Sequence, residues 1–308
     1  MRRWLGALAL IALAGKALAG EDGGQPLAFS KMPVGARSAA MGQAGGAVGG
    51  DAYGMVANPA LLATLQDLRL GSQWATLPTG RSQQFLSFGR PIDKGSDTGY
   101  GLAYDRSSLE TGIERRRANT PDPESVFGES ASIFTIGLGG WFWPQKLAGG
   151  ANVKILAQTL GDASGGGFSG DFGLFLRTWP WLDLGLCIQD VASRFTWNTG
   201  TSDPIPLVVR SSAVAKSSDD RWRLAVDIDK SQVQDLHLKL GTELWFWPKL
   251  FALRAGWSQG QWSGGLGLET SFTKYLSNAG IDYAIIGDPL GDGAMQQRIS
   301  LNVGVSLD

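Results

Sequence analysis

Long stretches of this chain alternate apolar and polar side chains, and this period of two restricts the fold more than any other feature. In RWRLAVDIDK, which starts at Arg221, the residues Trp222, Leu224, Val226 and Ile228 alternate with charged or small residues. The last run, RISLNVGVSL, repeats the pattern. Successive side chains of a strand point to opposite faces, so each run predicts a β-strand between two different environments.

Alternation alone leaves two architectures open, a soluble β-sandwich and a membrane β-barrel. The predicted strands run to about 9–11 residues, the length that a tilted strand needs to cross a bilayer, against about 5–6 in soluble sheets. Their polar faces mix charges of both signs with many of the 44 glycines, which suits a hydrated or plugged lumen. Both features favour the membrane barrel.

Tryptophans beside prolines close several of the alternating runs. Trp143, Trp179 and Trp247 each precede a proline, and another run begins within a few residues. Proline cannot donate to a strand ladder, and tryptophan prefers the membrane interface. We therefore predict that these three tryptophans belong to an aromatic girdle at one rim. The other strand ends are joined by longer polar loops, the longest spanning Ser107–Ser130, and this asymmetry is typical of outer-membrane barrels.

The N-terminus has the layout of a secretory signal peptide. Arg2 and Arg3 precede an apolar run from Trp4 to Ala14, and a small-x-small cleavage site ends at Ala19. We predict a signal peptide over residues 1–19. No later stretch is apolar enough for a transmembrane helix, so export to the outer membrane as a multi-pass barrel is the expected location.

Composition and motifs argue against several functions. The 27 basic and 28 acidic residues nearly cancel, which disfavours a nucleic-acid partner. The single cysteine, Cys187, excludes an intramolecular disulfide, and no Cys/His spacing suggests a metal. The only histidine, His237, lies on the polar face of a predicted strand, where a hydrogen-bonding role is the simpler interpretation. We predict no catalytic residue, no cofactor and no enzyme activity.

Counting the runs predicts an all-β fold, a 14-stranded antiparallel transmembrane barrel over residues 67–308. The predicted strands lie near 68–78, 81–90, 98–107, 131–143, 147–159, 168–179, 182–194, 205–216, 221–230, 235–247, 250–258, 261–273, 279–287 and 295–307. Closure satisfies every edge hydrogen bond, which lipid would leave unmade. A ring of this size is too wide for its own side chains to fill, so the lumen is either a pore or plugged.

Residues 20–66, before the first strand, are the candidate plug. The stretch from Val34 to Ala63 is rich in Gly and Ala, with Arg37 and Asp51 as its only charged residues. Small residues permit close backbone approach, and Asn58-Pro59 is a turn signal. The alternatives are a disordered linker and a segment folded into the lumen; the lack of charge favours the latter.

The same stretch resembles the N-terminal signature of PorV/PorQ-type outer-membrane proteins, which belong to the FadL-like superfamily of barrels. The shared residues are Gly35, Ala36, Arg37, Met41, Gly42, Gly46, Asp51, Asn58, Pro59, Ala60, Leu62 and Ala63. The resemblance implies that this segment is a hatch inside the barrel. Outer-membrane barrels commonly end in an aromatic residue, whereas this sequence ends Leu307-Asp308.

The resemblance also implies two possible roles. One is passage of hydrophobic small molecules across the outer membrane. The other is a non-transporting role in protein secretion or surface attachment, with exported proteins as partners. We favour transport by a single monomeric barrel in contact with outer-membrane lipid and lipopolysaccharide.

Charged residues on the polar faces of two neighbouring predicted strands suggest a network in the lumen. Asp227 and Asp229 share a face, but Arg221 and Arg223 share it too, so a structural charge network is a better interpretation than a catalytic carboxylate pair. The predicted members are Arg221, Arg223, Asp227, Asp229, Lys239 and Glu243.

Overall fold

The computed structural model of the protein describes residues 26–116, 122–233, 235–247, 250–271, 276–287 and 295–307. The predicted signal peptide, Pro248 and Asp308 lie outside the described residues. Four short helices come first: η1 (Ala28–Lys31), α1 (Ala36–Ala40), α2 (Gly54–Ala57) and η2 (Pro59–Thr64), with η3 (Pro78–Gly80) in a later turn. No helix among the described residues is long and apolar enough to cross a membrane.

All other regular structure is strand. The strands are β1 (Leu68–Thr76), β2 (Ser82–Pro91), β3 (Thr98–Arg115), β4 (Ser125–Trp143), β5 (Leu147–Leu160), β6 (Ala163–Trp179), β7 (Leu182–Trp197), β8 (Ser202–Asp203), β9 (Val208–Lys216), β10 (Trp222–Ser231), β11 (His237–Phe246), β12 (Phe251–Ser258), β13 (Gln261–Ser271), β14 (Leu276–Gly287) and β15 (Met295–Val305). The predicted starts and ends agree with most of these within a few residues.

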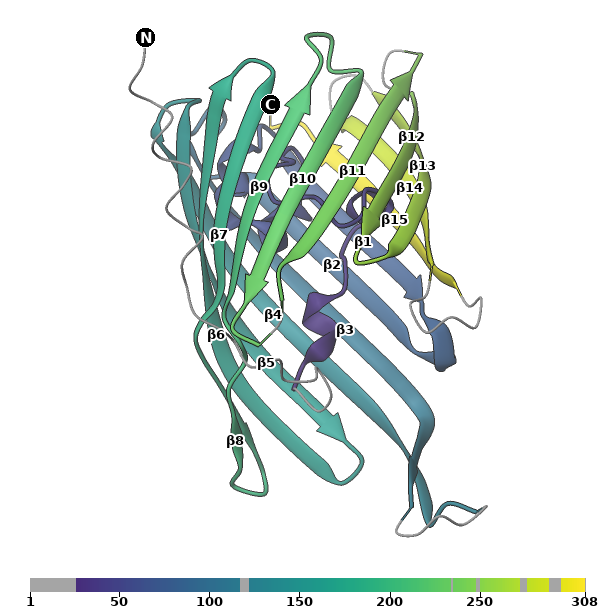
Figure 1. Cartoon of the computed structure of the whole chain (residues 1–308). Helices are drawn as coiled ribbons and strands as arrows, with labels where there is room; N and C mark the ends of the chain where they lie inside the picture. Colours follow the sequence, from purple (N-terminus) through teal and green to yellow (C-terminus); the bar gives the residue numbers. More distant parts are fainter. Residues whose placement is uncertain are drawn as a thin grey trace.

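The strands close into one antiparallel ring. Each strand pairs with its chain neighbour, β1 pairs with β15, and β7 pairs with both β6 and β9. The two-residue β8 pairs only with the end of β7, in the hairpin that follows it. The other fourteen strands form the barrel, as the sequence predicts (Figure 1).

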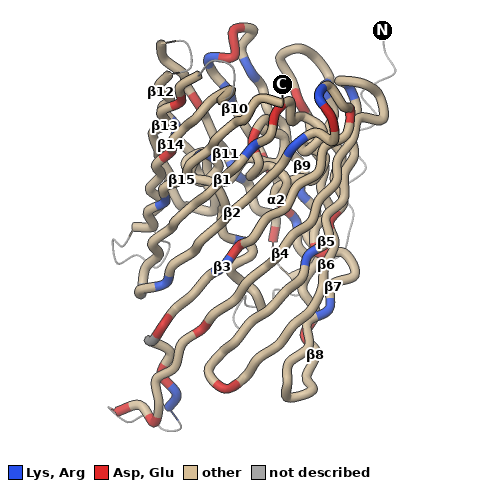
Figure 2. Tube along the Cα trace, turned by 180° about the vertical axis from the view of Figure 1, so that it is seen from behind, with Lys and Arg blue, Asp and Glu red and all other residues tan. Residues whose placement is uncertain are grey.

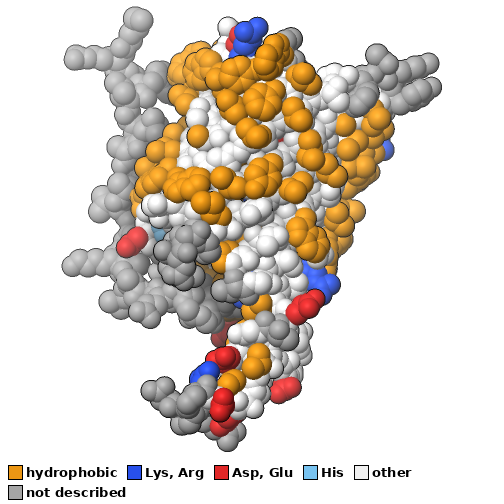
Figure 3. Space-filling model, turned by 90° about the vertical axis from the view of Figure 1, so that its right-hand side faces the viewer, with side chains coloured by type: hydrophobic (Ala, Val, Ile, Leu, Met, Phe, Trp, Pro, Cys, Tyr) orange, Lys and Arg blue, Asp and Glu red, His pale blue; other side chains and the backbone are white. Residues whose placement is uncertain are grey.

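The two faces of the ring differ as the alternation predicts. Apolar side chains such as Leu86, Val153 and Phe172 are exposed on the outside, whereas Asn152 and Asp171 are buried inside. Hydrophobic side chains spread over the outer surface of the barrel, and charged ones gather on the narrow projection below it (Figure 3). Seen from behind, charged positions are frequent at strand ends and on the β3–β4 hairpin (Figure 2). The outer face is therefore suited to lipid.

The ring is cut obliquely at one end. Strands β3–β7, here called the tall wall, have 14–19 residues, whereas β9–β15 with β1 and β2, the low wall, have 8–12. The prediction of a long loop over Ser107–Ser130 is therefore wrong for most of its length. β3 and β4 keep pairing to Arg115 and Ser125, and β6 begins at Ala163. Beyond the membrane both faces of a strand are polar, so the alternation that marks strands in the sequence disappears.

One strand start also differs from the prediction. β9 begins at Val208 and not at residue 205. Pro204 and Pro206 precede it, and a proline cannot donate its backbone nitrogen to a strand ladder. Their presence explains the later start.

The N-terminal segment, residues 26–66, lies inside the ring (Figure 1). Its apolar side chains form shared clusters with inward-facing strand residues. Leu27 and Phe29 pack with Ile133 and Leu156 of the tall wall, and Leu61 packs with residues of several strands. The core of the molecule is therefore the contact between this segment and the inner barrel face.

Candidate functional site

Glycines let the backbone of the N-terminal segment touch the strands. Gly42 has a φ of 62°, and a Cβ there would collide with backbone atoms of Leu240 and Trp257. A Cβ on Gly46 would collide with Ser212. On the barrel side, Gly256 faces Gly42 just as closely. These glycines are therefore needed for close contact between the segment and the strands, and not for backbone flexibility.

Asn58 holds two parts of the segment and the barrel together through one fully buried amide. Its Nδ2 donates to the carbonyls of Gly46 and Leu174, each at 3.0 Å. Its Oδ1 accepts from the backbone nitrogen of Ala60 at 3.1 Å and so caps η2, whose first residue is Pro59. The Asn-Pro-Ala motif is thus a cap and an anchor at the same time.

Arg37 is the main ionic contact between the segment and the low wall. Its Nε and Nη2 donate to the two carboxylate oxygens of Glu243, at 2.8 and 2.7 Å. Asp51 lies 3.4 Å from the same guanidinium and accepts from the backbone nitrogens of Tyr53 and Gly54. Burial alone would lower the pKa of Arg37, but the carboxylates around it, Glu243 first and then Asp51, together outweigh burial and raise that pKa.

Five of the six predicted network residues face the lumen, but they divide into groups. Glu243 is fully buried and contacts Arg223, Arg254 and Arg37. Asp229 pairs with Lys239 at 2.8 Å and with Arg210. Asp227 accepts from the backbone nitrogens of Gly45 and Gly46, at 3.1 and 2.9 Å.

Arg221 lies apart from this network. Its side chain is 63% exposed in the turn before β10, where it pairs with Asp219. The alternation extends past the end of the strand in the sequence, which explains why the pattern groups Arg221 with the inward residues. Sequence reasoning also did not single out Arg210, although it pairs with Asp229 on the next strand.

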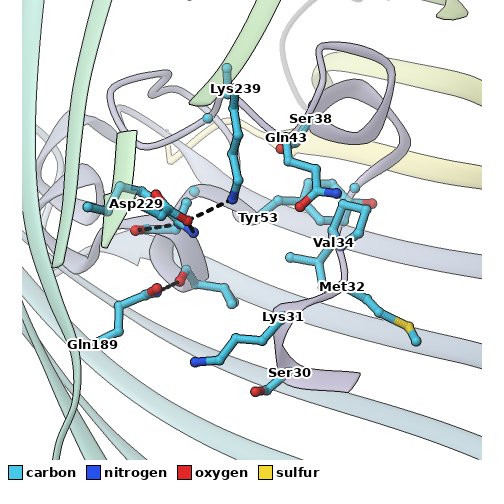
Figure 4. A pocket seen from close by; sticks show the side chains of 18 of the residues that line it. Ser30, Lys31, Met32, Val34, Ser38, Gln43, Tyr53, Gln189, Asp229 and Lys239 are labelled. Carbon is cyan, nitrogen blue, oxygen red and sulfur yellow. Dashed lines mark hydrogen bonds and ion pairs between the residues drawn. The ribbon is translucent and has the colours of Figure 1, made fainter. Parts of the chain in front are cut away.

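A cavity of about 300 Å³ lies in the lumen beside the N-terminal segment. One part of its lining is apolar and includes Val34, Tyr53, Val56, Phe85 and Ile133. Polar residues of both walls line the rest: the low wall contributes Asp229, Ser231, His237, Lys239, Ser258 and Gln261, and the tall wall contributes Asp105, Thr135, Lys154, Gln189 and Asp190. Figure 4 shows Lys239 pointing into this space toward Asp229, across from Val34 and Met32.

The cavity has the shape and chemistry of a binding site for a small molecule with an apolar body. Among the described residues, no group of His, Cys, Asp or Glu side chains could hold a metal ion. Several of the charged side chains that line it form ion pairs: Lys154 pairs with Asp190, and both Arg210 and Lys239 pair with Asp229.

The predicted girdle tryptophans all lie at the rim where β1 begins and β15 ends. Trp143, Trp179 and Trp247 are 58%, 52% and 73% exposed. Trp179 stacks on Trp181 with ring centroids 5.5 Å apart, and Lys146 lies over the ring of Trp143.

The sequence WFWP occurs twice, at 141–144 and 245–248, and the first tryptophan of each copy has a different role, which the sequence did not reveal. Trp245 is buried on the inner face beside Arg254. Trp141 faces inward and donates from Nε1 to the carbonyl of Ala63 at 2.7 Å. The two repeats thus contact the lumen with one tryptophan and the membrane side with the other.

No known protein family and no curated protein matches the sequence. Solved structures share the fold. The P. putida toluene transporter TodX is 14% identical, with a TM-score of 0.56 over 88% of this chain and 97% of its own. A Pseudomonas aeruginosa FadL homologue is 12% identical, with a TM-score of 0.58 over 89% and 98%. The CymD monoaromatic hydrocarbon channel is 15% identical, with a TM-score of 0.58 over 88% and 96%.

These neighbours are FadL-family outer-membrane barrels, and at such low identity the likeness shows a common fold. The fold of this chain is accordingly the β-barrel fold of these channels.

Proposed function

We propose that the protein passes hydrophobic small molecules across the outer membrane, with the N-terminal segment as a hatch in the lumen. The observation that carries this proposal is the half-apolar cavity, which adjoins a segment held to the low wall by polar contacts. Known channels with this fold are described as carrying toluene and other monoaromatic hydrocarbons, which supports the same class of cargo.

The end that holds the start of β1 and the end of β15 is, in this proposal, the periplasmic end. The tryptophan turns lie there, and short turns are typical of the periplasmic rim. The tall wall then projects to the outside of the cell.

Uptake of a fluorescent aromatic amine, N-phenyl-1-naphthylamine, by proteoliposomes tests the proposal. Val34 lines the cavity, so Val34→Trp should fill it and abolish protein-dependent uptake. Val153→Trp is the matched control because Val153 is 60% exposed on the outer face. Equal uptake by both variants and the unmodified protein would contradict the proposal.

A role in secretion or surface attachment of exported proteins is the second candidate. The tall wall favours it, because β3 and β4 extend well past their neighbours and offer a projecting surface. In that case Val34→Trp should leave the activity intact, whereas shortening the β3–β4 hairpin should remove it.

A further inference from the structure

The rim of the low wall lies at the depth of the lipid headgroups. β12 has eight residues, and at a rise of about 3.3 Å and a tilt of ~40° it covers roughly 20 Å of membrane depth. The apolar band of an outer-membrane barrel is about 25 Å tall. The turn after Ser258 therefore has no room to project far beyond the bilayer.

Aromatic side chains on the lipid face support this placement. Trp257 and Trp262 are directly paired across β12 and β13, and both are exposed on the outside. Trp247 is exposed at the opposite end of the same wall. Because tryptophan prefers the two interfaces, these residues bracket a thin membrane-spanning region. Leu236, which precedes β11 at the same rim, is 62% exposed.

The inner side of the same rim lines the cavity. Ser231 ends β10, His237 begins β11, Ser258 ends β12 and Gln261 begins β13; all four border the cavity, as does the exposed Gln259 in the β12–β13 turn. The low rim thus lies between the cavity on one side and the headgroup layer on the other.

The tall wall offers no equivalent access. Leu27 and Phe29 cover the inner face of this wall beside the cavity, where they pack on Ile133, Leu156 and Phe195. Its outer end carries exposed charged residues, including Glu114, Arg116 and Glu124, and stands in water.

We propose that the cavity loads over the low rim, directly from the outer leaflet, with an amphipathic molecule that has a polar end and an apolar body. Such molecules concentrate at the headgroup layer, where this rim lies. The polar end would face Lys239, Gln259 and Ser231, and the apolar body would contact Phe85, Ile133 and Tyr53. The inference rests on the proposed function, because it assumes that the cavity holds the transported molecule.

The depth of the rim is tested with spin labels in the Cys187→Ser background. A nitroxide on Gln259→Cys should show the exposure of a headgroup position, with contact both to dissolved oxygen and to a water-soluble nickel chelate. The same label on Asp162→Cys, at the β5–β6 turn of the tall wall, should behave as in bulk water. Equal, fully aqueous behaviour at both positions would overturn the inference.

Loading is tested with vesicles that already contain N-phenyl-1-naphthylamine. A bulky maleimide-polyethylene glycol on Gln232→Cys, in the exposed turn after β10 at the same rim and outside the cavity lining, should slow loading about tenfold and leave the amount bound at equilibrium unchanged, because it obstructs access and not the cavity. The same group at position 162 should have little effect. The reverse order, or no difference, would contradict access over the low rim. Failure of the unmodified protein to bind the probe at all would instead contradict the proposed function, and the access route with it.

Discussion

The N-terminal segment forms hydrogen bonds to both walls, but it packs side chains of different size against them. Toward the tall wall, η2 and its neighbours present Leu61, Leu62 and Met55, which pack into buried apolar clusters. Toward the low wall, α1 presents small alanines, and the contact adds Arg37 on Glu243. Separating large apolar side chains leaves a cavity, which costs free energy. Groups separated from an ion pair can instead form hydrogen bonds to water, so their separation costs less.

This difference assigns separate roles to the two contacts. The η2 side is suited to remain attached, and the α1 side is suited to release. Release at the low wall would also widen the cavity, because Arg37, Ser38 and Met41 of the segment line it. The two walls should differ only on their inner faces, where they contact the segment, because the outer faces of both present apolar residues to lipid.

Deletion of residues 34–60 should have the largest effect. It removes both contacts together, and the mixed charges of the lumen would then line a wide aqueous passage. We expect the intact protein to conduct ions poorly in planar bilayers and the deletion variant to show large, steady conductance with the barrel still folded. The same conductance with and without the segment would show that it does not close the lumen.

Charges placed on the lipid face test whether the walls are equivalent outside. Ile188→Arg on the tall wall and Leu253→Arg on the low wall should each cost about 2–4 kcal/mol of unfolding free energy in lipid vesicles. Gln189→Arg, one residue from Ile188 but facing the cavity, should cost much less. A large cost for Gln189→Arg, or a negligible cost for either outer variant, would refute the assignment of faces.

Arg37→Met tests the low-wall contact alone. Loss of hydrogen bonds to a charged group costs about 1.5–3 kcal/mol, so the fraction of time that the channel is open should rise ~10-fold or more in single-channel records. Arg221→Met is the control, because Arg221 is exposed in a turn and should leave the records unchanged. If both variants behave alike, the low-wall contact is not the one that releases.

The smallest expected effect concerns the tryptophan rim. Trp143, Trp179 and Trp247 should be quenched more strongly by a lipid brominated near the headgroup than by one brominated near the chain end. Variants with one of the three changed to Phe isolate each contribution to the fluorescence. Strongest quenching by the lipid brominated near the chain end would contradict the placement of these tryptophans at the membrane interface.

Much of the barrel could be predicted from the sequence, because period-two alternation persists wherever one face meets lipid. Strands such as β5 and β10 are therefore bounded within a residue or two. The extra length of the tall wall could not be predicted, since Leu109 and Ile113 are the only apolar residues in Ser107–Arg115 and the alternation is lost there. The contacts within the site could not be predicted either. Arg37 and Glu243 are separated by 206 positions, and alternation indicates which face a side chain lies on but not which residue it contacts.

The most direct test of the account is a reversible cross-link between the segment and the low wall. The Ser300 hydroxyl accepts from the backbone nitrogen of Ala36 at 3.1 Å, so cysteines at both positions, in the Cys187→Ser background, lie close enough to be joined. Uptake of N-phenyl-1-naphthylamine should stop when the pair is oxidised and return when it is reduced, with the Ala36→Cys single variant unaffected by either treatment. Unchanged uptake by the fully cross-linked protein would contradict release of the segment from the low wall as the step that opens the channel.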